Sequence, residues 1–356
     1  MKSVPVRIRG RALNIAAMAA DAATTPADFS WRDGERIVLF RRGALGKADK
    51  ILRQHSWDEY DLLSTARALK TAPRGLEAVG SVHEVPPGPV PEAAKRIMAT
   101  VRGVAMVALG GGRVIDTAKA IAAAHGGRVC AIPTTLSGAE MTAIHRLPEG
   151  HEGRALVRPA LVIADPDAMT TQPEDQLRAS AMNALAHGAE ALYAPFANPV
   201  ATMAALRGAG LIAAALDSER ERRDRAALAL GSILCAYALD SALFSLHHVV
   251  CQSIVRTCRT PHAETNATML PRTMEAMRYR APEAIHDLAV ALGADPDRIG
   301  ARIEELGGGA RRLADLGGDP GCLDAALDAM LERAELQWVP DPPDRSELEA
   351  LIEDPD

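Results

Sequence analysis

The feature that most constrains the fold is an unbroken apolar run, GVAMVAL at residues 103–109, followed directly by three glycines and a helix-forming segment at 114–125. A run of this kind, without polar alternation, is typical of a strand buried on both faces of a parallel sheet. Further strand-like segments occur at 36–40, 60–64, 128–133 and 160–166. Strands that alternate with helices predict an α/β domain whose parallel sheet is covered on both faces.

The three glycines, Gly110, Gly111 and Gly112, lie where the buried strand should turn into the helix. Glycine lets the backbone approach a ligand closely, and the helix N-terminus offers free N–H groups and a partial positive charge to a phosphate. Asp116 and Lys119 on that helix join them as candidate cofactor contacts. The pattern is not GxGxxG, and a tight turn without a ligand is the alternative interpretation.

A second candidate for cofactor binding follows the strand at 128–133. Thr134, Thr135 and Ser137 place small hydroxyl groups after a strand end, where they could bind a phosphate or a ribose. A capped turn without a ligand explains the same residues equally well.

The pattern changes after about residue 167, where helices are predicted at 176–193, 198–216, 224–243 and 262–278. A length of 356 residues also favours two domains. We therefore predict an N-terminal arm at 1–32, a dinucleotide-binding α/β domain with a parallel sheet at 33–166, and an all-helical substrate and catalytic domain at 167–356. The arm is interpreted as an extra segment or helix rather than a signal or transit peptide.

The net charge, the length of the apolar runs and the cysteine spacing indicate which binding partners and which compartment to expect. The net charge of −6 gives no electrostatic reason to expect nucleic acid or an anionic membrane. No uninterrupted run of about 18 apolar residues predicts a membrane span. The five cysteines form no CxxC pair, and we interpret them as buried reduced thiols in a cytoplasmic protein, with a redox sensor or a disulfide partner as the alternative.

Polar residues spaced by four in the predicted helices form a candidate catalytic or metal-binding cluster. Asn183 and His187 share one helix face, His248 and Gln252 share another, and His262 follows a proline at a probable helix start. These side chains could converge on one pocket, although each histidine could instead be structural. Since Asn183 carries no charge, a divalent metal is doubtful. Two further residues lie beside the cluster. Glu190 is interpreted as a helix-surface or supporting residue, with a direct site role as the alternative. His247 is interpreted as an ordinary surface or core histidine.

Six motifs in order carry a family resemblance: LGGGxxxDxAKA at 109–120, IPTTxSGxEMT at 132–142, ADP at 164–166, MNALAHGAEALYA at 182–194, HHVVCQ at 247–252 and TPHAETNATMLP at 260–271. Together they resemble iron-containing alcohol dehydrogenases over about residues 33–290. The NALAH segment, the doubled histidine and the following Cys251 look most like the maleylacetate reductase branch.

The resemblance implies a nucleotide domain, a helical domain, a catalytic cleft between them, and NAD or NADP as cofactor, often in a homodimer. By matching positions it implies that Gly111, Gly112, Thr134 and Thr135 face the cofactor, with Ser137 less clearly placed. It also implies that three histidines, His187, His248 and His262, occupy the metal-site positions of the family, where Asn183 replaces the usual Asp.

Departures from the family pattern touch both the cofactor side and the substrate side. Arg113 follows the glycines where Ser is usual, and Ala139 replaces Ser in the GSE triplet. Gln252 replaces a His near the reacting carbons, and Val255 with Arg256 replaces a pair of glycines. Further departures are His145, Arg146 and Arg154. Each could be neutral drift, but together they place the family reaction in question.

These observations leave three hypotheses. The first is an NAD(P)H-dependent reductase of a small oxo or unsaturated (di)carboxylate, in which His248, Gln252 and Arg256 are catalytic and Arg256 with Arg259 attracts the anion. The second is a metal-dependent alcohol dehydrogenase, with Asn183 and the three histidines around the ion. The third is a non-redox pathway protein that retains the fold.

Overall fold

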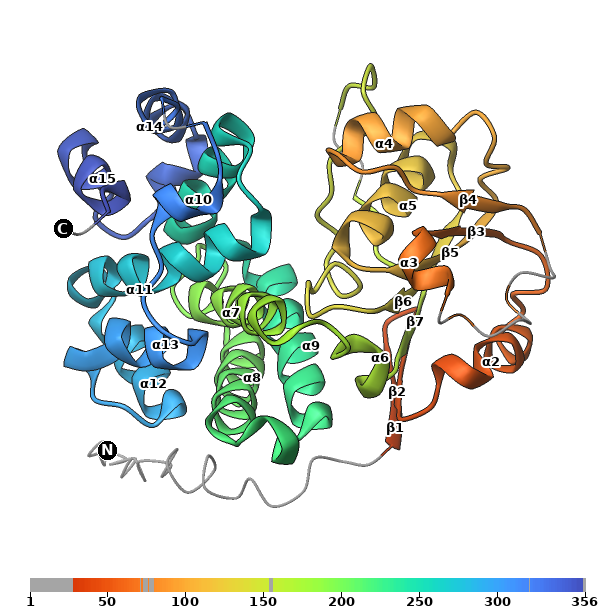
Figure 1. The fold of residues 1–356 in the computed structure, drawn as a ribbon, viewed down its shortest axis with the longest axis horizontal. Coiled ribbons are helices and arrows are strands. Elements are labelled where there is room, and N and C mark those ends of the chain that lie inside the picture. Colours follow the sequence, from red (N-terminus) through yellow and green to blue (C-terminus); the bar gives the residue numbers. More distant parts are fainter. Residues whose placement is uncertain are drawn as a thin grey trace, which may run out of the picture.

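The computed structural model describes residues 28–354, apart from residues 71, 73–75, 77–79, 154, 155 and 320. The chain forms two lobes, an α/β lobe and a helical lobe (Figure 1). Seven strands form one sheet in the order β1-β2-β7-β6-β5-β3-β4. Their bounds are β1 Asp28–Asp33, β2 Arg36–Arg41, β3 Asp61–Ser64, β4 Val82–Glu84, β5 Ala105–Gly110, β6 Arg128–Pro133 and β7 Leu161–Ala164.

The sheet confirms the predicted parallel architecture, because every pair of neighbours except β1 and β2 runs parallel. Strand β5 is buried along its whole length. Val107 and Leu109 point into one core, and Met106 and Ala108 point into the other. Helices α2 (Ala48–Gln54) and α3 (Ala66–Leu69) cover the first core, while α4 (Val90–Ile97) and α5 (Gly112–His125) cover the second.

Two strands were not predicted. β4 is three residues long with no buried position, so it has no apolar pattern to reveal it. β1 pairs antiparallel with β2 at the edge of the sheet, so the sheet begins at Asp28, inside the segment that we assigned to the N-terminal arm. Residues 1–27 of that arm lie outside the described residues. The division of the chain at residues 33 and 167 remains our proposal.

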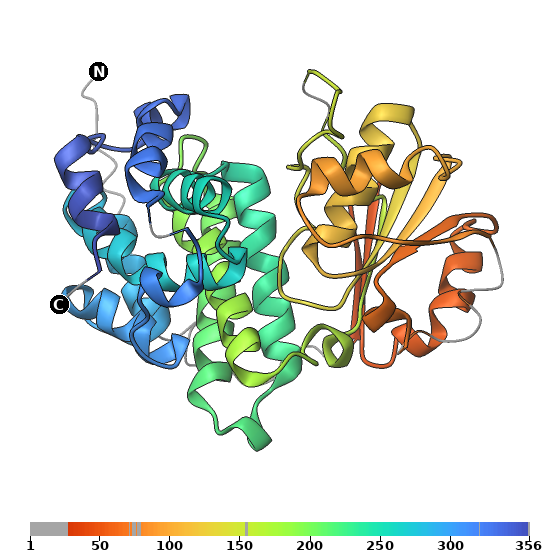
Figure 2. The same ribbon diagram turned by 45° about the horizontal axis from the view of Figure 1, so that its top comes forward.

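The helical lobe follows β7, the last strand in the described part of the chain. Its helices are α6 Pro166–Met169, α7 Glu174–Ala191, α8 Pro199–Asp217, α9 Arg225–Ala242, α10 Leu246–Cys258, α11 His262–Arg280, α12 Pro282–Leu292, α13 Ile299–Gly307, α14 Leu323–Leu331 and α15 Arg345–Ile352. The short α6 lies beside the sheet, α7 to α9 come next, and α12, α14 and α15 lie on the far side (Figures 1 and 2).

Two of these helices, α8 and α9, are long and apolar enough to cross a bilayer by length and composition alone. Their apolar stretches are 50% and 72% buried within the protein. Both supply many residues to the main core of the lobe, which fits the interpretation that they are core helices.

The two lobes share a core. The main helical core includes Val38 and Phe40 of β2 and Val162 of β7, together with Leu136 of the loop after β6. The backbone N–H of Leu136 donates to the Ser180 hydroxyl at 3.1 Å, and the Ser232 hydroxyl donates to the Leu136 carbonyl at 3.0 Å. The loop that carries the predicted cofactor hydroxyls is therefore anchored to α7 and α9.

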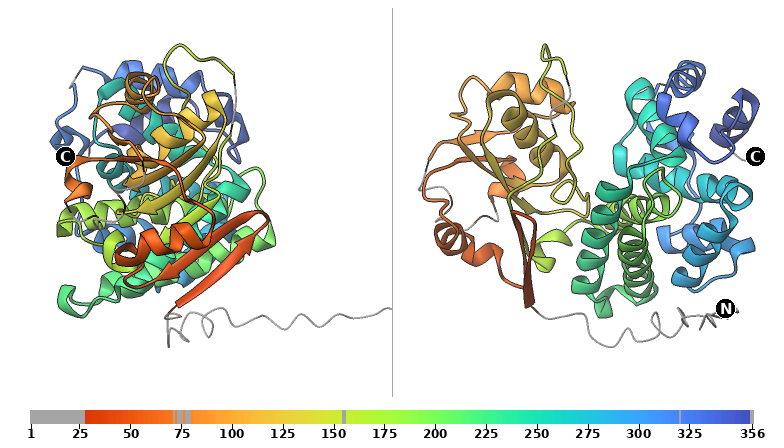
Figure 3. Two further views of the ribbon diagram at one scale, coloured as in Figure 1. Left: turned by 90° about the vertical axis from the view of Figure 1, so that its right-hand side faces the viewer. Right: turned by 180° about the vertical axis from the view of Figure 1, so that it is seen from behind.

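The cysteines differ from the expectation of five reduced thiols. Cys258, the last residue of α10, forms a disulfide with Cys322, which directly precedes α14. The other three, Cys130, Cys235 and Cys251, are buried free thiols. The two partners are 64 residues apart in sequence, and they meet only because the C-terminal segment folds back onto the helical lobe (Figure 3).

Candidate active site

The glycine turn joins β5 to α5 in a space too narrow for side chains. Gly111 caps α5, and Gly112 is its first residue. A Cβ atom on Gly110 would lie 2.7 Å from Val114, one on Gly111 would lie 3.0 Å from Thr135, and one on Gly112 would lie 3.0 Å from Ser137. The glycine turn and the loop after β6 therefore pack directly against each other, with the first N–H groups of α5 beside them.

The glycine turn forms one side of a cradle that a ligand could enter. Thr134 and Thr135, in the loop after β6, form the other side of this cradle. The Thr134 N–H donates to the Gly110 carbonyl at 3.0 Å, which fixes the loop to the end of β5. The Thr135 hydroxyl oxygen is buried and has no hydrogen-bond partner in the described structure. An unpartnered hydroxyl beside a helix N-terminus fits a phosphate or ribose group of a dinucleotide.

Lys119 is placed differently from the other candidates. Its side chain is fully buried, where its ammonium group donates to the carbonyls of Ala139 and Ile144 and pairs with Asp116 at 2.7 Å. These contacts hold the segment after Gly138 against α5. Lys119 therefore supports the backbone next to the cradle through these buried contacts. Its direct contact with a cofactor remains a prediction.

The predicted cluster on α7 and α10 comes together at the junction of the lobes. The rings of His187 and His248 stack with centroids 5.1 Å apart. Asn183 and His187 are both buried, and the amide oxygen of the first and Nδ1 of the second have no hydrogen-bond partner within the described residues. A Cβ atom on Gly138, whose φ is +75°, would lie 3.0 Å from Nδ1 of His187, so the loop after β6 reaches the histidines.

Glu190 is a central supporting residue of this site. It is fully buried, and one carboxylate oxygen contacts Nδ1 of His248 at a very short distance. The other oxygen accepts the backbone N–H groups of Ser245 at 3.0 Å and His248 at 3.3 Å. Burial raises the pKa of Glu190 to about 7 and lowers the pKa of His248 to about 3. At neutral pH the imidazole is therefore uncharged, and Nε2 is the nitrogen left for a substrate.

His262, the first residue of α11, is exposed, and its Nε2 lies 3.5 Å from the Asn266 amide nitrogen. Desolvation lowers its pKa, while the carboxylates of Asp116 and Glu264 raise it. Its charge in turn contributes to the lowered pKa values of His187 and His248. Asp116 belongs to the glycine-turn helix, so His262 and that helix are near enough for their charges to interact.

His247 is a core histidine, which is one of the two positions that its interpretation as a surface or core residue left open. Its Nδ1 lies 2.9 Å from the Thr273 hydroxyl, and its Nε2 lies 2.8 Å from the Asn266 amide oxygen. Both ring nitrogens are therefore engaged by α11, and neither is available to a ligand.

Gln252 and Arg256 continue the face of α10 that carries His248. The Gln252 amide oxygen accepts from Arg256 at 3.1 Å and from Arg333 at 3.0 Å. Arg333 precedes the 3-10 helix Ala334–Trp338 and was missed by sequence reasoning, because it lies in the tail outside every motif. Glu140 was also missed: it is fully buried, its two carboxyl oxygens have no hydrogen-bond partner among the described residues, and burial raises its pKa to about 7.

Comparison with known proteins agrees with this geometry. Residues 36–166 match the family described as iron-containing alcohol dehydrogenase, and residues 178–354 match the C-terminal part of the Fe-containing alcohol dehydrogenase family. A maleylacetate reductase from a Rhizobium species is 31% identical over 347 residues, covering 93% of this chain and 95% of the relative. The chain belongs to the iron-containing alcohol dehydrogenase family.

Solved structures of this family have the same fold. Maleylacetate reductase from Agrobacterium tumefaciens superposes with a TM-score of 0.77 at 28% identity, covering 92% of this chain and 97% of that one. An iron-containing alcohol dehydrogenase from Corynebacterium glutamicum gives a TM-score of 0.80 at 27% identity, with 92% and 96% covered. Within the iron-containing alcohol dehydrogenase family, the chain is close to the maleylacetate reductases.

The metal for which the family is named does not fit the donor set at this site. The charged ligand position is taken by Asn183, a neutral amide. Among the described residues, no group of three His, Cys, Asp or Glu side chains is arranged to hold an ion. We therefore derive no step through a metal, and weak or absent metal dependence remains a prediction.

The other departures from the iron-containing alcohol dehydrogenase pattern lie around the same junction. Arg113 is exposed on the first turn of α5, and Ala139 is buried behind the cradle, where its carbonyl accepts from Lys119. Arg259 is exposed and has a left-handed backbone, with φ at +57°. Val255 is half-buried on α10. Arg154 lies outside the described residues.

Proposed function

We propose that this chain is an NAD(P)H-dependent reductase of a small oxo or unsaturated (di)carboxylate. The observation that carries the proposal is the buried Glu190–His248 pair, which lies beside the cradle of the glycine turn. The cradle supports dinucleotide binding, since Thr135 has a free hydroxyl there. The proposal is further supported by relatives described as maleylacetate reductases.

A bound nicotinamide would supply the hydride. The part of the protein is then to deliver one proton to the substrate atom that becomes negative. When Glu190 is protonated it donates to Nδ1 of His248, which leaves the imidazole proton on Nε2. As the Nε2 proton passes to the substrate, the Glu190 proton moves to Nδ1. The imidazole stays neutral and Glu190 becomes a carboxylate. The pair is reset when solvent reprotonates Nε2 and the Nδ1 proton moves back to Glu190.

This relay assigns different roles to the predicted catalytic residues. His248 is the proton donor, and Glu190 is a positioning residue that supplies the proton behind it. Arg256 faces the substrate anion, because it is exposed on the same helix face and carries a fixed charge. Gln252 has no proton to transfer at neutral pH, so we assign it to holding arginines rather than to acid–base chemistry.

The test follows the near-ultraviolet absorbance of NADH and NADPH with a panel of oxo acids and unsaturated oxo diacids that includes maleylacetate. We expect oxidation of at least one cofactor by one acid, and a rate loss on the order of 10²–10⁴ in His248→Ala. Full activity in His248→Ala would refute the relay. Cofactor binding without any oxidation across the panel would favour a non-redox role.

We also propose a cytoplasmic homodimer, as the family resemblance implies. Sedimentation of the purified protein tests the dimer. A monomer at micromolar concentration would overturn it.

A further inference from the structure

Two arginines from distant parts of the chain meet at one uncharged oxygen, the amide oxygen of Gln252. Gln252 of α10 accepts from Arg256, one turn further along the same helix, and from Arg333, which lies 81 residues away in sequence. His248, Gln252 and Arg256 are spaced by four and therefore share one helix face. The Arg256–Gln252–Arg333 cluster thus lies directly next to the proposed proton donor.

The cluster has more positive charge than its own residues neutralise. Arg333 pairs with Glu335 through contacts of 3.0 and 3.2 Å. Arg256 has no carboxylate partner among the described residues, and its one side-chain hydrogen bond goes to Gln252. Partial desolvation and the charges of Arg333 and Arg146 lower the pKa of Arg256, while Glu335 raises it, so three guanidinium groups lie near a single carboxylate. Four of the five N–H donors of Arg256 remain for a ligand.

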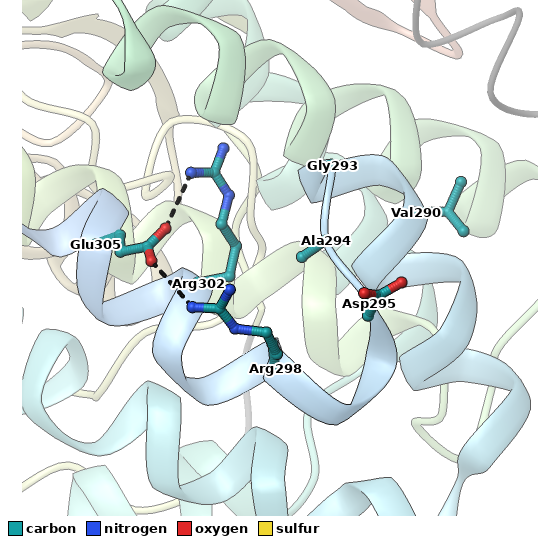
Figure 4. Close-up of a pocket in the computed structure, with 7 residues that line it drawn as sticks. All are labelled: Val290, Gly293, Ala294, Asp295, Arg298, Arg302 and Glu305. Carbon is teal, nitrogen blue, oxygen red and sulfur yellow. Dashed lines mark hydrogen bonds and ion pairs between the residues drawn. The ribbon is translucent and has the colours of Figure 1, made fainter.

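A second arginine pair, at another place in the helical lobe, differs because its charge is neutralised by carboxylates. A cavity of about 430 Å³ at α12 and α13 is lined by Arg298 and Arg302, and both contact Glu305 (Figure 4). Arg302 also pairs with Asp217 at 2.6 Å. The two guanidinium groups there have two carboxylates, so no charge is left for an anion.

We propose that Arg333, fixed by Gln252 and acting together with Arg256, forms a subsite for a substrate carboxylate, and that Gln252 is its positioning residue. A neutral carbonyl suits this task, because it can accept from two guanidinium groups at once without cancelling their charge. The subsite selects substrates with a carboxylate separate from the reacting group. This inference rests on the proposed reductase function.

The experiment uses succinate as an unreactive dicarboxylate probe. Calorimetric titration at low ionic strength measures succinate binding, while fluorescence measures NADH binding to the same proteins. Arg333→Met should weaken succinate binding 10- to 100-fold and leave NADH affinity within about twofold, because charge-assisted bonds to the anion are lost. Arg333→Lys should recover part of the loss, and the control Arg298→Met should bind succinate like the wild type.

Gln252→Glu separates a binding role from a purely structural one. Glutamate keeps the acceptor in place and binds both arginines more strongly, so the thermal midpoint should stay equal or rise. Its negative charge should nevertheless weaken succinate binding at least tenfold. Unchanged succinate binding in Gln252→Glu would mean that the cluster only fastens the C-terminal segment to α10, and the proposal would be wrong.

The outcomes distinguish this inference from the proposed function. Wild-type protein that binds NADH but not succinate overturns the subsite and leaves the reductase proposal standing. Wild-type protein that binds succinate through Arg333 but neither NADH nor NADPH supports the anion subsite while overturning the reductase proposal.

Discussion

Removal of the Cys258–Cys322 disulfide should lower the free energy of unfolding of the helical lobe by about 4 kcal/mol. The bond closes a loop with a sequence separation of 64 residues. In the chain-entropy model, a loop of that length removes about 14 cal/mol/K from the unfolded state, which is about 4 kcal/mol at 25 °C. Because whole domains are stable by only about 5–15 kcal/mol, the change is a large part of the total.

The perturbation is the double variant Cys258→Ser with Cys322→Ser, compared with oxidised and reduced wild type by urea unfolding. Both cysteines are buried in the native protein, so reduction should need unfolding or prolonged exposure to a dithiol. The variant should unfold at lower urea, with a steeper dependence on denaturant because its unfolded chain is less compact. The single variant Cys130→Ser is the control for removal of a buried thiol.

Mass spectrometry after alkylation shows whether the Cys258–Cys322 bond is present in the oxidised sample. If the bond is present and the variant loses less than about 1 kcal/mol, the loop-entropy reasoning is wrong for this chain. If both thiols are alkylated in protein purified without reductant, the pairing itself is wrong. Wild type purified without reductant and the double variant should in that case unfold at the same urea concentration.

Four further outcomes follow from the site. Glu190→Gln should slow reduction by roughly 10²-fold, and the wild-type rate should fall as pH rises through about 7, where Glu190 loses the proton that it donates; a pH–rate profile of both proteins tests this. Gly111→Val should abolish NADH binding in a fluorescence titration, because a Cβ atom there already lies 3.0 Å from Thr135. His247→Ala should lower the unfolding free energy by roughly 2–4 kcal/mol, since it removes two buried hydrogen bonds and leaves the Asn266 amide oxygen without its imidazole partner; thermal melts should show this loss while turnover per folded molecule is kept. A chelator should leave activity unchanged, and loss of activity together with a stoichiometric ion by elemental analysis would contradict our assignment of the histidines.

Features encoded locally were predictable from the sequence. The apolar run before the glycines became β5 and the segment after them became α5, because burial on both faces and a glycine turn each leave a short-range signal. The helical spans of the second lobe were predicted within a few residues, for example 262–278 against His262–Arg280. The short strand β4 was missed, since it is held by backbone pairing to β3 and not by buried side chains.

Contacts between distant segments were not predictable, and they decide the roles of several site residues. Spacing along α7 placed Glu190 beside His187 but could not show that its carboxyl group reaches His248, 58 residues later. The spacing of five cysteines likewise gave no sign that the start of α14 would meet the end of α10. A contact of this kind depends on how helices pack, and packing leaves no periodic signal in either partner alone.

Gln252 is the residue whose interpretation changes most once its contacts with distant segments are known. Judged alone, a glutamine in place of a family histidine indicates a lost proton donor and therefore a lost reaction. In the folded chain the same residue accepts from Arg256 and Arg333 together. A neutral imidazole has one acceptor nitrogen and a protonated one has none, so histidine could not hold both guanidinium groups in this way. The substitution and Arg333 therefore have to be interpreted as one unit. In the proposed relay the proton comes from His248, one turn earlier on α10, with Glu190 of α7 behind it.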